Sequence, residues 1–147
     1  MRPHEQRIVR CYVAMNLMVG DFGEAYAHRQ FVQAGYEVAY PTEQKQGDLR
    51  IKNPNTGEVL RVEIKTSQKG VRGWCVCLNK AGKTSVAHAD MVVLQLITRA
   101  GFVVSYFIPS ELLINKKSIS FRTADSPNSK WAQYRKPNYD VFGGASA

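Results

Sequence analysis

The sequence feature that most constrains the fold is a pair of strand-like segments, residues 48–52 and 59–65, separated by turn-forming residues at 53–57. This arrangement predicts a β-hairpin. Side chains alternate between the two faces of a strand, so the polar and apolar residues of each segment fall on opposite faces. If the apolar rows enter the core, Asp48 and the polar pair Glu63 and Lys65 share the other face. We therefore expect these three side chains to converge at one end of the hairpin.

The remaining patterns predict an α/β fold with a central mixed β-sheet flanked by helices. Helical spacing occurs at 8–19 and again from Asp21 to about Ala34. Asp21 is expected to cap the second helix with Glu24 as its capping-box partner, and Gly35 is expected to end it. Further strands are predicted at 36–40, 74–78, 91–97, 102–108 and 119–121, and further helices from Ser110 and over 128–135.

At 147 residues the chain fits one domain. We expect a single domain over 1–147, with an N-terminal helix or arm (1–19), a core that carries the site (20–113), and a C-terminal strand, helix and basic-aromatic tail (114–147). No apolar run approaches the ~20 residues that span a bilayer, and the N-terminus lacks a secretory pattern. These observations predict a cytoplasmic protein without a membrane partner.

The three cysteines carry little functional information. Cys11, Cys75 and Cys77 lack zinc-site spacing. We interpret all three as buried thiols.

The charge is more informative, because a net charge of +8 favours a polyanionic partner. No acidic residue occurs from 64 to 89, although five basic residues do. A solvated surface is the alternative interpretation, and composition favours nucleic-acid binding only modestly. The basic residues that we expect to bind nucleic acid are Lys69, Arg72, Lys80, Lys83, Lys130, Arg135 and Lys136.

Phosphodiester hydrolysis is a reaction that the combination of Asp48, Glu63 and Lys65 could catalyse. Two carboxylates can bind a hard cation such as Mg²⁺, which polarises the phosphate and activates water. A lysine beside them can orient the water or stabilise developing negative charge. The alternative is an exposed polar row whose ion pair contributes little. The upstream aspartate on the paired strand favours the catalytic interpretation.

These motifs resemble the PD-(D/E)xK nuclease superfamily. The resemblance rests on Gly47-Asp48, on Glu63-Ile64-Lys65 with Thr66-Ser67-Gln68, and on the helix that begins Gly23-Glu24-Ala25. It covers roughly residues 20–113, with the hairpin as its most specific part. Gly47 stands where the family motif has proline, a position that is not a metal ligand. The resemblance implies a restriction-endonuclease-like core and similarity to Holliday junction resolvases and to an intron-encoded homing endonuclease branch.

The same resemblance implies roles for individual residues. Asp48, Glu63 and the backbone carbonyl of Ile64 would bind Mg²⁺, for which Mn²⁺ would substitute. Lys65 would be the catalytic lysine, and Glu24 would reach the metal directly or through water. Gln68 would contact the scissile phosphate.

The leading hypothesis is therefore a magnesium-dependent DNA endonuclease. We slightly favour a structure-selective enzyme of the Holliday junction resolvase type, active in recombination, because the catalytic core uses nearly the whole chain. A sequence-specific homing or restriction-type enzyme acting on duplex DNA is the alternative. Both interpretations predict a homodimer or higher homo-oligomer, because two strands must be cut. A phage or mobile element would be a suitable source for so small a nuclease.

Two other classes of function remain as alternatives. A non-catalytic nucleic-acid-binding module would have no need for two carboxylates facing phosphate. A small-molecule or protein-binding domain is not supported, because the sequence has no phosphate loop, dinucleotide fingerprint or nucleophile elbow.

Overall fold

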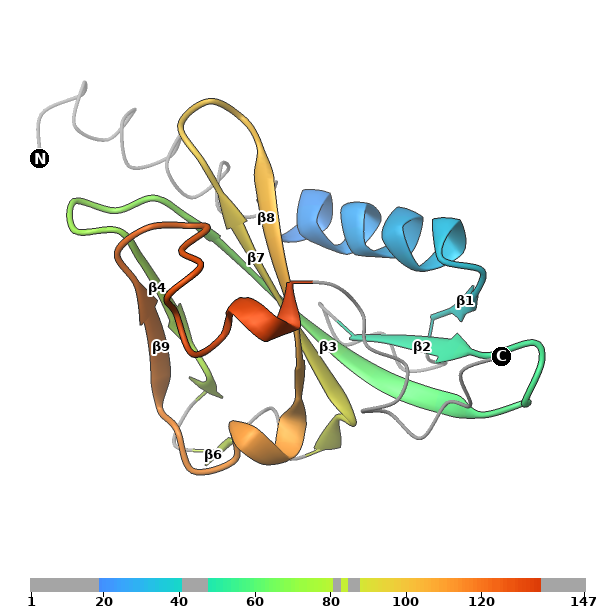
Figure 1. The fold of residues 1–147 in the computed structure, drawn as a ribbon. Coiled ribbons are helices and arrows are strands. Elements are labelled where there is room, and N and C mark those ends of the chain that lie inside the picture. The colour runs from blue at the N-terminus through green and yellow to red at the C-terminus, as the bar shows by residue number, and fades with distance from the viewer. Residues whose placement is uncertain (1–18, 41–47, 81–82, 85–87, 136–147) are drawn as a thin grey trace, which may run out of the picture.

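A computed structural model describes residues 19–40, 48–80, 83–84 and 88–135, with the backbone alone at Asp48, 79–80 and 83–84. Its centre is a five-stranded sheet in the order β1-β2-β3-β7-β8 (Figure 1). β3 and β7 pair in parallel, whereas the other neighbours pair antiparallel, so the predicted mixed α/β sheet is confirmed. The strands are β1 (Glu37–Ala39), β2 (Asp48–Lys52), β3 (Val59–Gln68), β7 (Met91–Ile97) and β8 (Val103–Pro109).

A helix over residues 19–33 covers one face of this sheet. Its residues Ala27 and Phe31 are fully buried against a cluster that includes Leu49, Val62 and Val93 from the sheet. The periodic apolar spacing therefore produces the predicted amphipathic helix. The predicted helix at 8–19 lies almost entirely outside the described residues.

Gly35 ends the helix, as predicted. Its φ of +94° is accessible to glycine at little cost, and its N–H donates to the carbonyl of Val32. The N–H of Tyr36 donates to the carbonyl of Phe31, which completes a Schellman motif. The predicted cap at Asp21 is wrong, because residues 19 and 20 are already helical. Glu24 therefore has no capping-box role.

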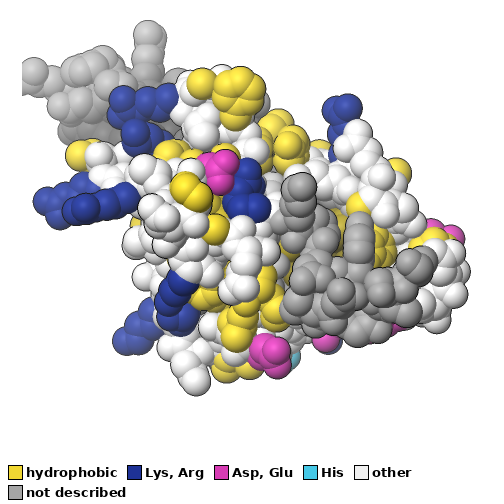
Figure 2. Space-filling model, in the orientation of Figure 1, with side chains coloured by type: hydrophobic (Ala, Val, Ile, Leu, Met, Phe, Trp, Pro, Cys, Tyr) yellow, Lys and Arg dark blue, Asp and Glu magenta, His cyan; other side chains and the backbone are white. Residues whose placement is uncertain are grey.

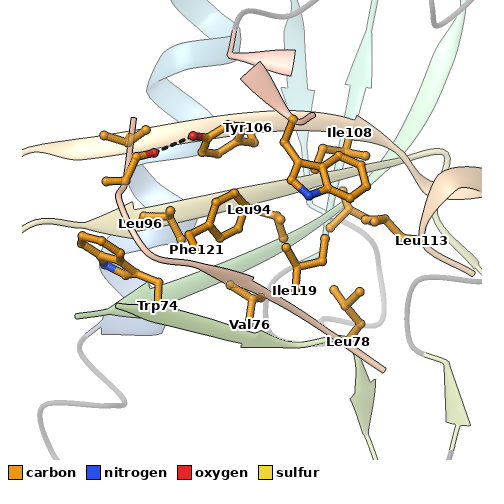
Figure 3. Packing of buried hydrophobic residues seen from close by; sticks show 14 residues of the cluster. Trp74, Val76, Leu78, Leu94, Leu96, Tyr106, Ile108, Leu113, Ile119 and Phe121 are labelled. Carbon is orange, nitrogen blue, oxygen red and sulfur yellow. Dashed lines mark hydrogen bonds between the residues drawn. The ribbon is translucent and has the colours of Figure 1, made fainter. Parts of the chain in front are cut away.

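Among the described residues, the other face of the sheet is covered by strands rather than by a second helix. β4 (Trp74–Cys77) pairs antiparallel with β9 (Ser118–Phe121) in a separate two-stranded sheet. Figure 3 shows the apolar side chains of both strands packed against β7 and β8. A small β5–β6 hairpin (Asn79–Lys80 with Lys83–Thr84) follows β4.

The C-terminal part of the described chain packs into this second core. The Tyr106 hydroxyl donates to the carbonyl of Ala124, 2.5 Å away, and burial raises the pKa of this phenol. Trp131 is buried in the same cluster. The predicted helices are wrong here: single 3-10 turns occur at η2 (Ser110–Leu112) and η3 (Ala132–Tyr134). Ser110 does not cap η2, because its hydroxyl donates to the carbonyl of Ala89.

Helix and sheet approach closely at Gly23. A Cβ added there would lie 1.8 Å from Thr66 Oγ1 and 2.7 Å from Gln95 Oε1. Gly23→Ala is therefore expected to destabilise the protein by about 1–3 kcal/mol through overpacking. The measurement is chemical denaturation of the single variant and of Gly23→Ala/Thr66→Ala, in which the nearer clash is removed. Gly23→Ala should cost less stability in the Thr66→Ala background than in the wild-type protein. An equal cost in both backgrounds would contradict this packing.

Candidate active site

The site begins with the hairpin of β2 and β3, whose pairing confirms the predicted hairpin. Asp48 opens β2 and lies directly opposite Glu63 in the antiparallel register. Lys65 lies two residues further along β3, on the same face as Glu63. The Lys65 Nζ is 3.3 Å from Glu63 Oε1, and the two side chains are 21% and 16% exposed, respectively. A partly buried ion pair therefore adjoins the start of β2.

Two cores determine which face these side chains take. Val62 and Ile64 are buried in the cluster under the helix. Alternation then places Glu63 and Lys65 on the other face, where their β7 neighbours Val92 and Leu94 belong to the second core. Glu63 and Lys65 consequently lie at the border of an apolar layer, which limits their contact with water.

The described strands determine where the backbone groups of β3 point next to this pair. β2 begins opposite Glu63, so beyond that residue the described strands pair with β3 only on the β7 side. The N–H of Arg61 donates to Asp90 Oδ2 and its carbonyl accepts from the Asp90 N–H, both at 2.8 Å, which directs these groups toward β7. Alternation along the strand places the Ile64 carbonyl on the opposite edge, next to Asp48.

The chemistry of this donor set fits a divalent cation. The carboxylates of Asp48 and Glu63, with one backbone carbonyl, are hard oxygen ligands of the kind that Mg²⁺ binds. Among the described side chains, no group of three His, Cys, Asp or Glu residues is placed to hold a metal. The side chain of Asp48 is outside the described part of the structure, so this statement does not include it.

Glu24 is half-buried and lies on the helix that covers the opposite face of β3 from Lys65. Its neighbour Gly23 packs against Thr66, the residue that follows Lys65. The fold therefore brings this part of the helix close to β3. It does not place Glu24 in the same row as Glu63.

Gln68 ends β3 and is exposed. By alternation it lies on the opposite face from Lys65. Ser67, which the sequence interpretation did not single out, shares the face of Glu63 and Lys65. Its hydroxyl lies 3.3 Å from the carbonyl oxygen of Gln68 and 3.4 Å from that of Cys75, and either can accept its hydrogen bond. The signal that could have identified Ser67 is the same period of two that selects Glu63 and Lys65.

The predicted nucleic-acid-binding residues fall into three groups. Lys69 and Arg72 are exposed in the turn between β3 and β4, and Lys130 is exposed beside Trp131. Arg135 bonds to Asp125 and to the carbonyl of Ser105, so its guanidinium is used within the fold. For the rest, Lys80 and Lys83 lie in β5 and β6 with only their backbone described, and Lys136 lies outside the described residues.

Comparisons with known proteins find similarity in three-dimensional structure but not in sequence. No protein-family model and no curated protein matches the sequence. The bacterial homing endonuclease I-Ssp6803I has a similar structure, with a TM-score of 0.61 and 20% sequence identity. The match covers 79% of this chain and 83% of that chain. At this identity the similarity shows a shared fold.

Proposed function

We propose that the protein is a metal-dependent DNA endonuclease of the PD-(D/E)xK type. The observation that carries this proposal is the register that sets Asp48 opposite Glu63, with Lys65 ion-paired to Glu63 on the same strand. A binding module would gain nothing from carboxylates placed against phosphate. The positive net charge of +8 also supports a polyanionic substrate.

In this proposal Asp48, Glu63 and the carbonyl of Ile64 hold Mg²⁺, and Glu24 contributes directly or through water. When bound, the cation supplies Lewis acidity and charge neutralisation at the phosphate. Lys65 orients the attacking water or stabilises the negative charge that builds on the phosphate oxygens. Glu63 fixes the Lys65 ammonium through their ion pair, and the adjoining apolar layer strengthens this interaction by excluding water.

Among DNA substrates, we propose sequence-specific cleavage of duplex DNA in preference to junction resolution. One structural neighbour is a homing endonuclease, which supports the alternative that the sequence left open. No comparison supports a Holliday junction resolvase. Cleavage of both strands would use two copies of the site, so we also propose a symmetric homo-oligomer. Within the described residues, no helix has the length and apolar character needed to cross a membrane.

The test is cleavage of a panel of nucleic acids in the presence of Mg²⁺. The panel contains a four-way junction, a flap, single-stranded DNA, RNA and long random-sequence duplex DNA, and cut positions are mapped. We expect cuts at one or a few sites in the long duplex, activity with Mn²⁺, and complete loss of cleavage in EDTA with recovery when Mg²⁺ is restored. Paired nicks confined to the junction would favour the resolvase alternative. Full activity in EDTA would exclude the metal mechanism.

A further inference from the structure

The outer face of the β4–β9 sheet is exposed and consists of short side chains. Trp74 and Val76 point into the core, so Cys75 and Cys77 point outward, and both thiols are exposed. The prediction that these cysteines are buried is therefore wrong, because this two-stranded sheet buries only one face; Cys11 lies outside the described residues. The register sets exposed serines opposite them, pairing Cys75 with Ser120 and Cys77 with Ser118.

Positive charge surrounds this face. The acid-free stretch 64–89 contains β4, and residues 112–124, which contain β9, also lack any acidic residue. Figure 2 shows Lys and Arg side chains gathered on the side of the molecule where β4 and β9 lie in Figure 1. Exposed basic side chains flank the two strands at Lys69, Arg72, Lys117 and Arg122.

The same face joins the candidate active site. The Ser67 hydroxyl, in the row of Glu63 and Lys65, lies 3.4 Å from the backbone carbonyl oxygen of Cys75. A cavity of about 540 Å³ lies between the end of β3, the 70–73 turn and the β4–β9 sheet. Its lining includes Gln68, Arg72 and Arg122. The cavity therefore connects Cys75 and Ser120 of the outer face with the end of β3, the strand that carries Lys65.

We propose that the outer face of the β4–β9 sheet binds duplex DNA in the major groove. Each strand has four residues. Two paired strands lie only ~4.8 Å apart, and a major groove ~12 Å wide admits such a two-stranded ribbon. The short hydroxyl and thiol side chains let the backbone approach base edges, where serine can donate or accept. The flanking Lys and Arg contact phosphates and set the position on the duplex. This inference rests on the proposed function, because it names the surface through which the nuclease would engage its substrate.

The exposed thiols provide a first test. In a Cys11→Ser/Lys65→Ala protein, which should not cut, maleimide modification of Cys75 and Cys77 is followed by mass spectrometry with and without a pool of random-sequence 40-bp duplexes. Bound DNA should slow modification of both thiols about tenfold or more at low salt, with protection lost as salt rises. Unchanged modification rates under conditions where DNA is demonstrably bound would overturn the proposal.

A second test places charge on the face. Ser120→Glu should weaken duplex binding about tenfold or more, because an added carboxylate would face the base edges and phosphates. Thr56→Glu, an equally exposed position in the β2–β3 turn, is the matched control and should bind within about twofold of wild type. Circular dichroism verifies that both variants fold. Equal binding by the two variants would overturn the assignment of this surface.

The two tests separate this inference from the proposed function. If wild type cleaves DNA but Ser120→Glu cleaves and binds normally, the ribbon assignment fails and the nuclease proposal stands. If no DNA is bound or cleaved by wild type, both proposals fail. If Ser120→Glu converts an oligomer to a monomer in analytical ultracentrifugation and leaves the DNA affinity of the monomer unchanged, the face is an interface between copies and the DNA proposal is wrong.

Discussion

Lys65→Ala is expected to lower the rate of DNA cleavage by about 10²–10³-fold while leaving the fold intact. The Lys65 ammonium is held 3.3 Å from Glu63 at the border of an apolar layer, where a positive charge acts more strongly than in bulk water. Its removal eliminates a group that acts mainly on the transition state, so the loss should appear in kcat rather than in KM. The measurement is single-turnover cleavage of the preferred duplex at saturating enzyme.

Glu63→Gln provides the complementary variant. It keeps the shape of the side chain but removes the charge that would bind Mg²⁺ and pair with Lys65. We expect a loss of cleavage at least as large, together with a higher Mg²⁺ concentration for half-maximal activity. Lys52→Ala, an exposed lysine at the other end of β2, is the matched control for loss of positive charge. Cleavage by Lys65→Ala and Glu63→Gln at the rate of the control would show that this row is an ordinary polar surface.

The sequence predicted the β2–β3 hairpin better than its surroundings. The hairpin follows from local patterns alone, because a dense turn and two alternating rows determine both register and faces. The register of Asp48 with Glu63 confirms this reasoning. The alternation of side chains along β4 also predicts that Cys75 and Cys77 share one face of the strand. That this face is exposed follows only from the fold, in which β4 belongs to a two-stranded sheet with one buried face.

Other errors arose where tertiary packing decides the structure. The partner of β4 is β9, more than forty positions later in the chain, and no local pattern specifies that pairing. The segment before Asp21 is helical although Asp21 and Glu24 form an acceptable capping pattern, because a cap motif stabilises a helix start without preventing the helix from extending. Near the C-terminus, burial of Trp131 and the Arg135–Asp125 ion pair hold a single 3-10 turn where helical spacing predicted a longer helix.

Phe31→Ala is expected to have the largest effect on stability, at about 3–5 kcal/mol. Phe31 is fully buried and attaches the helix over 19–33 to the five-stranded sheet. Its ring packs edge-on against Phe107 of β8 at 5.9 Å and against Tyr36 at 6.1 Å, between ring centroids. Truncation leaves a cavity between the helix and the sheet, and both aromatic contacts are lost.

The expected loss is a large fraction of the ~5–15 kcal/mol that stabilises a typical domain. Urea denaturation followed by circular dichroism measures it. Val32→Ala is the matched control, since Val32 is the next residue on the same helix but is 50% exposed, and it should cost no more than about 0.5–1 kcal/mol. Because Phe31 lies on the opposite face of β3 from Lys65, the folded fraction of Phe31→Ala should retain most of its cleavage rate at low temperature. A cost for Phe31→Ala no greater than that for Val32→Ala would show that the helix does not pack on the sheet through this ring.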